Sequence, residues 1–129
     1  MSGERGQALL VVVVALAISA VAIVGLRYAQ DRAVTSARVQ RTGEAAVEAA
    51  AAYVADEYVR DRLGAKRLLT DPRVLAATRA AAQDLASRNG GGLVERLQLS
   101  CTAAGVEVSL VLSGFSHRAG FAAPECSQP

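Results

Sequence analysis

Cys101 and Cys126 are the residues of this 129-residue chain with the clearest capacity for covalent chemistry. In an exported protein, an even pair of cysteines predicts a disulfide, and closing this loop would stabilise the fold by about 3 kcal/mol through the lost entropy of the unfolded chain. The alternative is a pair of free buried thiols in a cytosolic segment. Two thiols and one distant histidine lack the paired spacing of zinc ligands, so we expect no metal site.

His117 is the only histidine, and it lies between Ser116 and Arg118. A catalytic imidazole needs an orienting carboxylate and a nucleophile beside it. Ser113 and Ser116 are close in sequence, but the glycine pattern of a nucleophile elbow does not surround them. We therefore predict a solvent-exposed loop histidine, no cofactor, and a protein that is not an enzyme.

Asp56, Glu57 and Asp61 form an acidic cluster in which Arg60 and Arg62 are interleaved. A calcium loop needs oxygen ligands at alternating positions of a turn and a glycine that bends the chain. On a helix, the same spacing predicts surface ion pairs such as Asp56 with Arg60. We expect no metal at this cluster.

Three glycines follow Asn89, at positions 90–92. They lack the Gly-Lys-Ser/Thr sequence of a phosphate loop, and they follow a predicted helix instead of preceding one. Asn and Gly readily adopt the left-handed conformation that closes a helix. The run therefore predicts a helix end and no nucleotide site. A net charge of only +2, from dispersed basic residues, does not favour nucleic acid as a partner.

The longest element is an uncharged apolar run from Ala8 to Leu26, which is 19 residues long. As a helix it would span about 28 Å, close to the hydrocarbon thickness of a bilayer. We predict a transmembrane helix at 8–26 after a short N-terminal tail, residues 1–7. Ala15, Ser19 and Ala22 have the small side chains that are typical of contacts between membrane helices.

No proline occurs between Arg27 and Leu63, so we predict that the helix continues over 7–63, with 27–63 as a helical stalk and Gly64 as its stop. One face of the stalk carries a stripe of small, apolar and aromatic residues: Val47, Ala50, Ala51, Val54 and Tyr58. This stripe packs either against the rest of its own chain or against equivalent helices of other subunits, and the sequence leaves both interpretations open.

Residues 64–129 predict a small α+β head. Asp71, followed by Pro72, begins a second helix, and its apolar face comprises Val74, Leu75, Thr78, Ala81, Ala82 and Leu85. Two alternating segments, 93–101 and 106–112, predict a β-hairpin, and the tail after it is expected to be irregular. The predicted fold class is α+β: a long N-terminal helix, a second helix and a disulfide-stapled hairpin, in a lollipop arrangement.

Charge and cysteine usage disagree about orientation. Four arginines follow the apolar run, at positions 27, 32, 38 and 41, and the positive-inside rule would keep this side in the cytoplasm. A disulfide instead requires an oxidising compartment. We favour an extracytoplasmic C-terminal domain, because a very short N-terminal tail needs no translocation.

Residues 4–9 read Glu-Arg-Gly-Gln-Ala-Leu and precede the apolar helix. The helix is followed by Arg27-Tyr28, by Val39-Gln40-Arg41 and by an alanine-rich segment at 44–52. In this arrangement residues 4–55 resemble the TadE/TadG-like proteins of tight-adherence (Tad, Flp-type) pilus systems. The resemblance implies partners among other pilin-like subunits or pilus-assembly proteins, with self-association into a filament as one outcome.

The resemblance also implies cleavage by a prepilin peptidase between Gly6 and Gln7. TadE-like members then carry Glu as the fifth mature residue, whereas this chain has Val11, which moves the likeness toward TadG-like or minor pilin-like members. We expect a structural or accessory component of a pilus or related secretion apparatus, in the membrane or in an extracellular pilus. The alternatives are a signal-anchored extracytoplasmic binding or adaptor domain, and a secreted domain released near Ala20 or Ala29.

Overall fold

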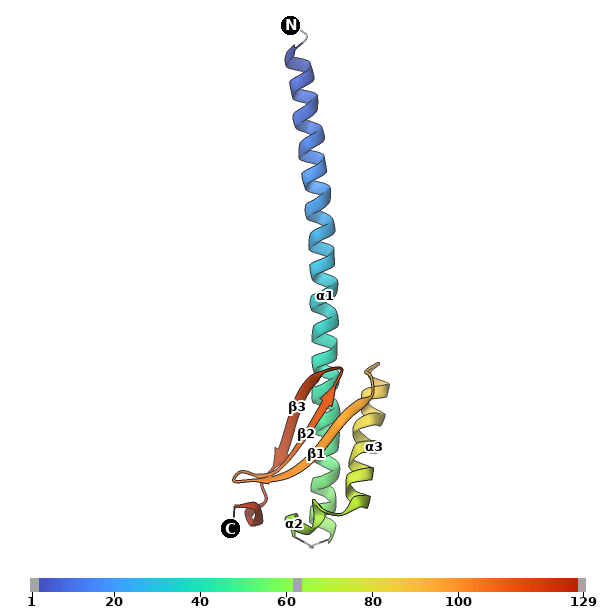
Figure 1. Ribbon diagram of the computed structural model, residues 1–129, viewed down its shortest axis with the longest axis vertical. Coiled ribbons are helices and arrows are strands. Elements are labelled where there is room, and N and C mark those ends of the chain that lie inside the picture. Colours follow the sequence, from blue (N-terminus) through green and yellow to red (C-terminus); the bar gives the residue numbers. More distant parts are fainter. Residues whose placement is uncertain (1–2, 62–63, 128–129) are drawn as a thin grey trace. The chain divides into compact units, whose positions relative to one another are not determined.

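The computed structural model describes residues 3–61 and 64–127. Its elements, in chain order, are α1 (Gly3–Asp61), α2 (Ala65–Leu68), α3 (Pro72–Arg88), β1 (Val94–Thr102), β2 (Gly105–Leu112), β3 (Phe115–Phe121) and the 3-10 turn η1 (Pro124–Cys126) (Figure 1). This composition confirms the α+β class. The chain divides into two compact units, Met1–Ala37 and Arg38–Pro129.

Helix α1 begins at Gly3, so residues 3–7 of the predicted tail are helical. Residues 3–7 contain no proline, and extending an existing helix costs little compared with nucleating one. At the other end, Asp61 is the last helical residue of α1, and the predicted end at residues 62–63 lies outside the described residues. Gly64 follows with a φ of +76°, a conformation that glycine adopts without strain.

In the C-terminal unit, small side chains of α1 and α3 pack in one core with larger side chains of β1 and β2. Ala46, Val47, Ala50 and Val54 of α1 are at most 1% exposed. This stripe is the part of α1 that is buried in the core cluster of the C-terminal unit.

Helix α3 begins as predicted: the Asp71 side chain accepts a hydrogen bond from the Arg73 amide at 2.8 Å. Its buried residues are Val74, Thr78, Ala82 and Ala86. The Thr78 hydroxyl donates to the Val74 carbonyl at 2.7 Å, one turn back, so its burial leaves no unsatisfied donor. The predicted face was wrong at Leu75, which is 40% exposed.

The three strands form one antiparallel sheet in the order β1-β2-β3. The predicted hairpin corresponds to β1 and β2. The predicted irregular tail was wrong, because β3 pairs with β2 from Leu112↔Phe115 to Val106↔Phe121. Ser113 and Gly114, with φ values of +51° and +78°, form the two-residue turn between these strands. Within this unit, the sheet lies across the C-terminal half of α1 (Figure 1).

Candidate functional site

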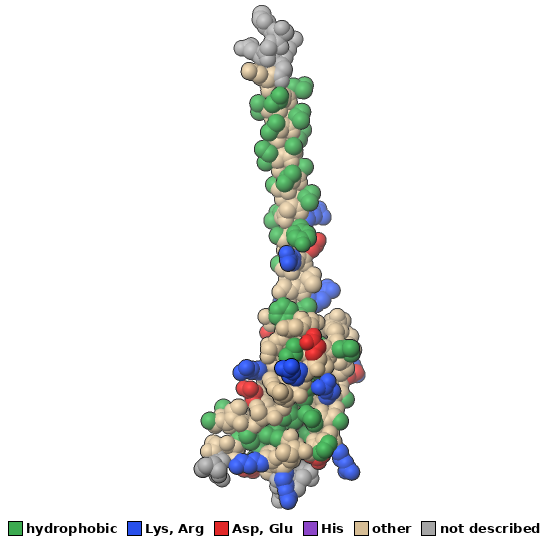
Figure 2. Space-filling model, in the orientation of Figure 1, with side chains coloured by type: hydrophobic (Ala, Val, Ile, Leu, Met, Phe, Trp, Pro, Cys, Tyr) green, Lys and Arg blue, Asp and Glu red, His purple; other side chains and the backbone are tan. Residues whose placement is uncertain are grey.

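Among the described residues, the most extensive exposed apolar surface is the N-terminal part of α1, residues 9–26. Every large hydrophobic side chain in this segment is exposed, from 47% at Val14 to 73% at Val21. Figure 2 shows apolar side chains along the visible face of this part of the helix. The helix is long and apolar enough to cross a membrane, and a signal sequence near an N-terminus shares these properties.

The predicted contact residues of this segment, Ala15, Ser19 and Ala22, are all exposed along α1. The Ser19 hydroxyl donates to the Ala15 carbonyl at 2.8 Å. This bond satisfies the only polar side chain of the segment internally, which a hydrocarbon environment requires. The predicted cleavage site, Gly6 and Gln7, lies within α1, and Gln7 is exposed.

The predicted stripe on the second half of α1 is covered by its own chain. Val47, Ala50, Ala51 and Val54 are buried in one cluster with side chains of the sheet and α3. Tyr58 is half-buried, and its ring lies 5.6 Å from that of Phe121, centroid to centroid. The structure therefore favours the interpretation in which the stripe supports the chain's own sheet.

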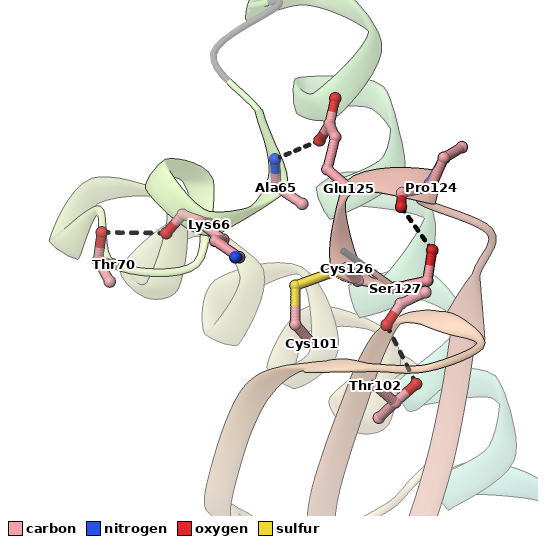
Figure 3. The surroundings of a disulfide bond; sticks show 10 residues. Ala65, Lys66, Thr70, Cys101, Thr102, Pro124, Glu125, Cys126 and Ser127 are labelled. Atoms are coloured by element: carbon pink, nitrogen blue, oxygen red, sulfur yellow. Dashed lines mark hydrogen bonds between the residues drawn. A yellow bond between two sulfur atoms is a disulfide. The ribbon is translucent and has the colours of Figure 1, made fainter. Parts of the chain in front are cut away.

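The two cysteines meet at the end of the sheet. Cys101 of β1 and Cys126 of η1 form a disulfide with their Cα atoms 5.1 Å apart. Next to it, the Glu125 carboxylate accepts a hydrogen bond from the Ala65 amide at 2.8 Å (Figure 3). The chain end is thus fixed to β1 covalently and to α2 by a charge-assisted hydrogen bond.

Glu125 also interacts with Tyr58. Partial burial of the phenol, then the charge of Glu125 and a hydrogen bond to its carboxylate, raise the pKa of Tyr58 above its usual value of 10.0. Sequence reasoning missed Glu125, because it lies in the tail that was expected to be irregular. The adjacent Pro124 and Cys126 were the only local signs of an ordered turn.

His117 is the largest departure from expectation: it is 6% exposed and lies on β3, so the predicted exposed loop histidine was wrong. Its imidazole packs on Gly43 of α1, where an added Cβ would overlap the ring. The Nε2 atom is buried and has no hydrogen-bond partner among the described residues. Ser116 faces the opposite side of the sheet, because alternate strand residues point to opposite faces. A lone glycine in an alanine-rich helix was the available signal of this contact.

The acidic cluster forms ion pairs on the surface of α1. Asp56 pairs with Arg60 at 3.0 Å, as the spacing predicted, and Glu57 lies 3.5 Å from the same guanidinium. No group of three potential metal ligands occurs within residues 3–61 and 64–127. The glycines at 90–92 follow the end of α3 at Arg88, in agreement with a helix stop.

Comparison with protein-family models, with curated proteins and with solved structures gave no match. The apolar segment of α1 and the folded C-terminal unit are therefore the features from which a function is inferred.

Proposed function

We propose that this chain is a membrane-anchored, pilin-like structural or accessory subunit of a Tad-type or type IV-like pilus or secretion apparatus. The observation that carries the proposal is the exposed apolar segment 9–26, which belongs to the same helix, α1, as the core stripe of the C-terminal unit. Such a segment must be covered by lipid or by equivalent helices. The disulfide supports an extracytoplasmic C-terminal unit, because disulfides persist in oxidising compartments.

A second candidate function is a signal-anchored extracytoplasmic binding or adaptor domain with no role in a filament. The burial of the stripe from Val47 to Val54 within its own chain favours it, since those residues are not available to neighbouring subunits. In this case the segment 9–26 serves only as a tether.

The mass of the mature protein tests whether the apolar segment is retained. We expect either an intact chain or a chain that begins at Gln7, as a prepilin peptidase would produce. Removal of about 20 or more residues would show that the segment is a signal peptide, and both membrane-anchored functions would then be wrong.

Cysteine cross-linking in membranes separates the subunit from the tether. The native cysteines are paired, so Ala15→Cys or Ala22→Cys adds the only free thiol. Val24→Cys is the matched control, because at 100° per residue it lies opposite Ala15 on the helix. The subunit proposal predicts oxidative dimers of the Ala15 and Ala22 variants, formed several-fold faster than those of the control. Equal rates, or monomers throughout, favour the tether.

A further inference from the structure

Side chains of α3 cover the start of β1, which is one of the two edge strands of the sheet. At β1, the Gln83 side chain of α3 accepts from the Val94 amide at 2.9 Å and donates to the Gly92 carbonyl at 3.3 Å. Arg79 donates to the Val94 carbonyl at 3.2 Å. Side chains of α3 therefore satisfy backbone groups at the start of β1, which limits pairing with another strand there.

The direction of the backbone groups of β3 follows from its turn. A two-residue turn makes Leu112 and Phe115 a hydrogen-bonded pair. Along an antiparallel ladder, hydrogen-bonded pairs then alternate with pairs that exchange no hydrogen bond. The β3 residues of the non-hydrogen-bonded pairs are Ser116, Arg118 and Gly120. They direct their main-chain N–H and C=O groups away from β2.

Ser116, Arg118 and Gly120 are all exposed, and β3 lies at one edge of the sheet (Figure 1). Within residues 3–61 and 64–127, no other group forms a hydrogen bond with the main chain of these three residues. The edge therefore offers three donors and three acceptors in the spacing that an added strand requires.

The charge beside this edge restricts what pairs with it. The Arg118 side chain is 71% exposed, and its ion-pair partner Glu107 lies at 4.0 Å. The Arg96 side chain, on the same face, forms no hydrogen bond or ion pair with the described residues. Both arginines line a groove of about 140 Å³ together with Ser109 and Ser116. An acidic side chain would complement this face.

A second copy of the chain complements this edge poorly in the register that pairs all three outward-facing residues of both strands. In this register, the two β3 strands pair antiparallel about a twofold axis that passes through Arg118. Arg118 of one copy therefore lies opposite Arg118 of the other copy. Like charges directly opposite each other destabilise a strand pair.

We propose that the edge of β3 binds an extended acidic segment of another protein, which adds a fourth antiparallel strand to the sheet. The segment carries an acidic residue opposite Arg118 and apolar residues at the alternate positions. Opposite Gly120 it accommodates a large side chain, because Gly120 has none and borders a groove of about 380 Å³. This proposal does not depend on the membrane role of residues 9–26.

The test uses the full chain in detergent micelles and a seven-residue peptide that alternates valine with threonine and has glutamate at its centre. The control peptide has lysine in place of glutamate. We expect the glutamate peptide to bind about five-fold more tightly, as cross-strand charge pairs allow. Its binding should shift and protect the amides of Ser116, Arg118 and Gly120 in nuclear magnetic resonance spectra.

Two variants examine the charge and the backbone separately. Arg118→Glu should reverse the preference between the two peptides, and Arg73→Glu is the matched control, because Arg73 is an exposed arginine of α3 and does not line the groove beside β3. Ser116→Pro removes an outward-facing N–H without removing a bond to β2, and should weaken binding of both peptides. Equal binding of the two peptides, an unchanged preference in Arg118→Glu, or shifts confined to β1 would overturn the proposal. Protection of the β3 amides by self-association alone would also overturn it, in favour of a second copy.

Discussion

Replacing Gly43 by alanine should change the stability of the C-terminal unit in opposite directions, depending on the residue at position 117. Alanine is the better helix former, and in an exposed helix interior the replacement would stabilise by about 0.5–1 kcal/mol. Here the new methyl group would overlap the buried imidazole of His117. Overpacking of a core costs about 1–3 kcal/mol, so we expect Gly43→Ala to destabilise the protein by about 1–2 kcal/mol.

In a His117→Ala background, the ring that causes the overlap is absent. The same Gly43→Ala substitution should then stabilise the protein by up to about 1 kcal/mol, through helix propensity and partial filling of the cavity. The coupling free energy of the double-mutant cycle is expected to be about 2 kcal/mol, within the range of residues in direct contact. The change of sign is the decisive quantity, because loss of a general packing contact would not produce it.

The assay is urea unfolding of the full chain in detergent micelles, followed by tyrosine fluorescence, for the four members of the cycle. Gly25→Ala is the matched control: a Cβ at Gly25 meets nothing within 4 Å, so unfolding of the C-terminal unit should not change. If Gly43→Ala stabilises the wild-type chain, or if the two substitutions are additive, then the imidazole is not fixed over Gly43 and the reasoning fails.

Three further predictions concern the turn and the chain end. Ser113→Gly should stabilise the protein by about 0.5–1 kcal/mol in thermal unfolding, because Ser113 has a φ of +51° and glycine adopts this conformation freely. The raised pKa of Tyr58 means that the folded state favours the neutral phenol. The stability that this preference contributes is present below pH 10 and is lost as the pH rises through the folded-state pKa. Absorbance at 295 nm should place its ionisation above pH 10, and Glu125→Gln should bring it down toward 10. Replacing both Cys101 and Cys126 by serine should cost about 3 kcal/mol in urea unfolding, whereas an unchanged midpoint would show that the closed loop of the disulfide does not stabilise the fold.

Periodicity identified the elements whose buried faces are apolar. Val106, Val108, Leu110 and Leu112 alternate along β2 and are all buried, as the pattern predicted. Strand β3 has the same alternation, but its inward-facing positions include a histidine and an alanine, which do not give a hydrophobic signal. The Ser113-Gly114 pair was the stronger indication of a second hairpin.

Partners across the fold could not be predicted from periodicity. The spacing of Val47, Ala50 and Val54 predicts a buried stripe, yet the spacing is the same whether a sheet or another subunit covers it. In α3 the buried stripe runs through alanines as far as Ala86, and small side chains give a weak apolar signal. Leu75 was therefore placed in the predicted face, although tertiary packing leaves it exposed.

The exposed face of α1 in the C-terminal unit restricts where copies of this chain can associate. Because the apolar stripe is covered by the sheet, this face presents charged side chains of both signs: Arg41, Glu44, Glu48, Asp56 and Arg60. Packing equivalent helices over residues 38–61 would remove these charges from water, which is costly unless each charge finds an opposite partner on the neighbouring helix. Segment 9–26 has no charged side chain and is apolar on all sides. The proposed subunit must therefore associate with its own copies through residues 9–26, and a filament held together by the second half of α1 would contradict this argument.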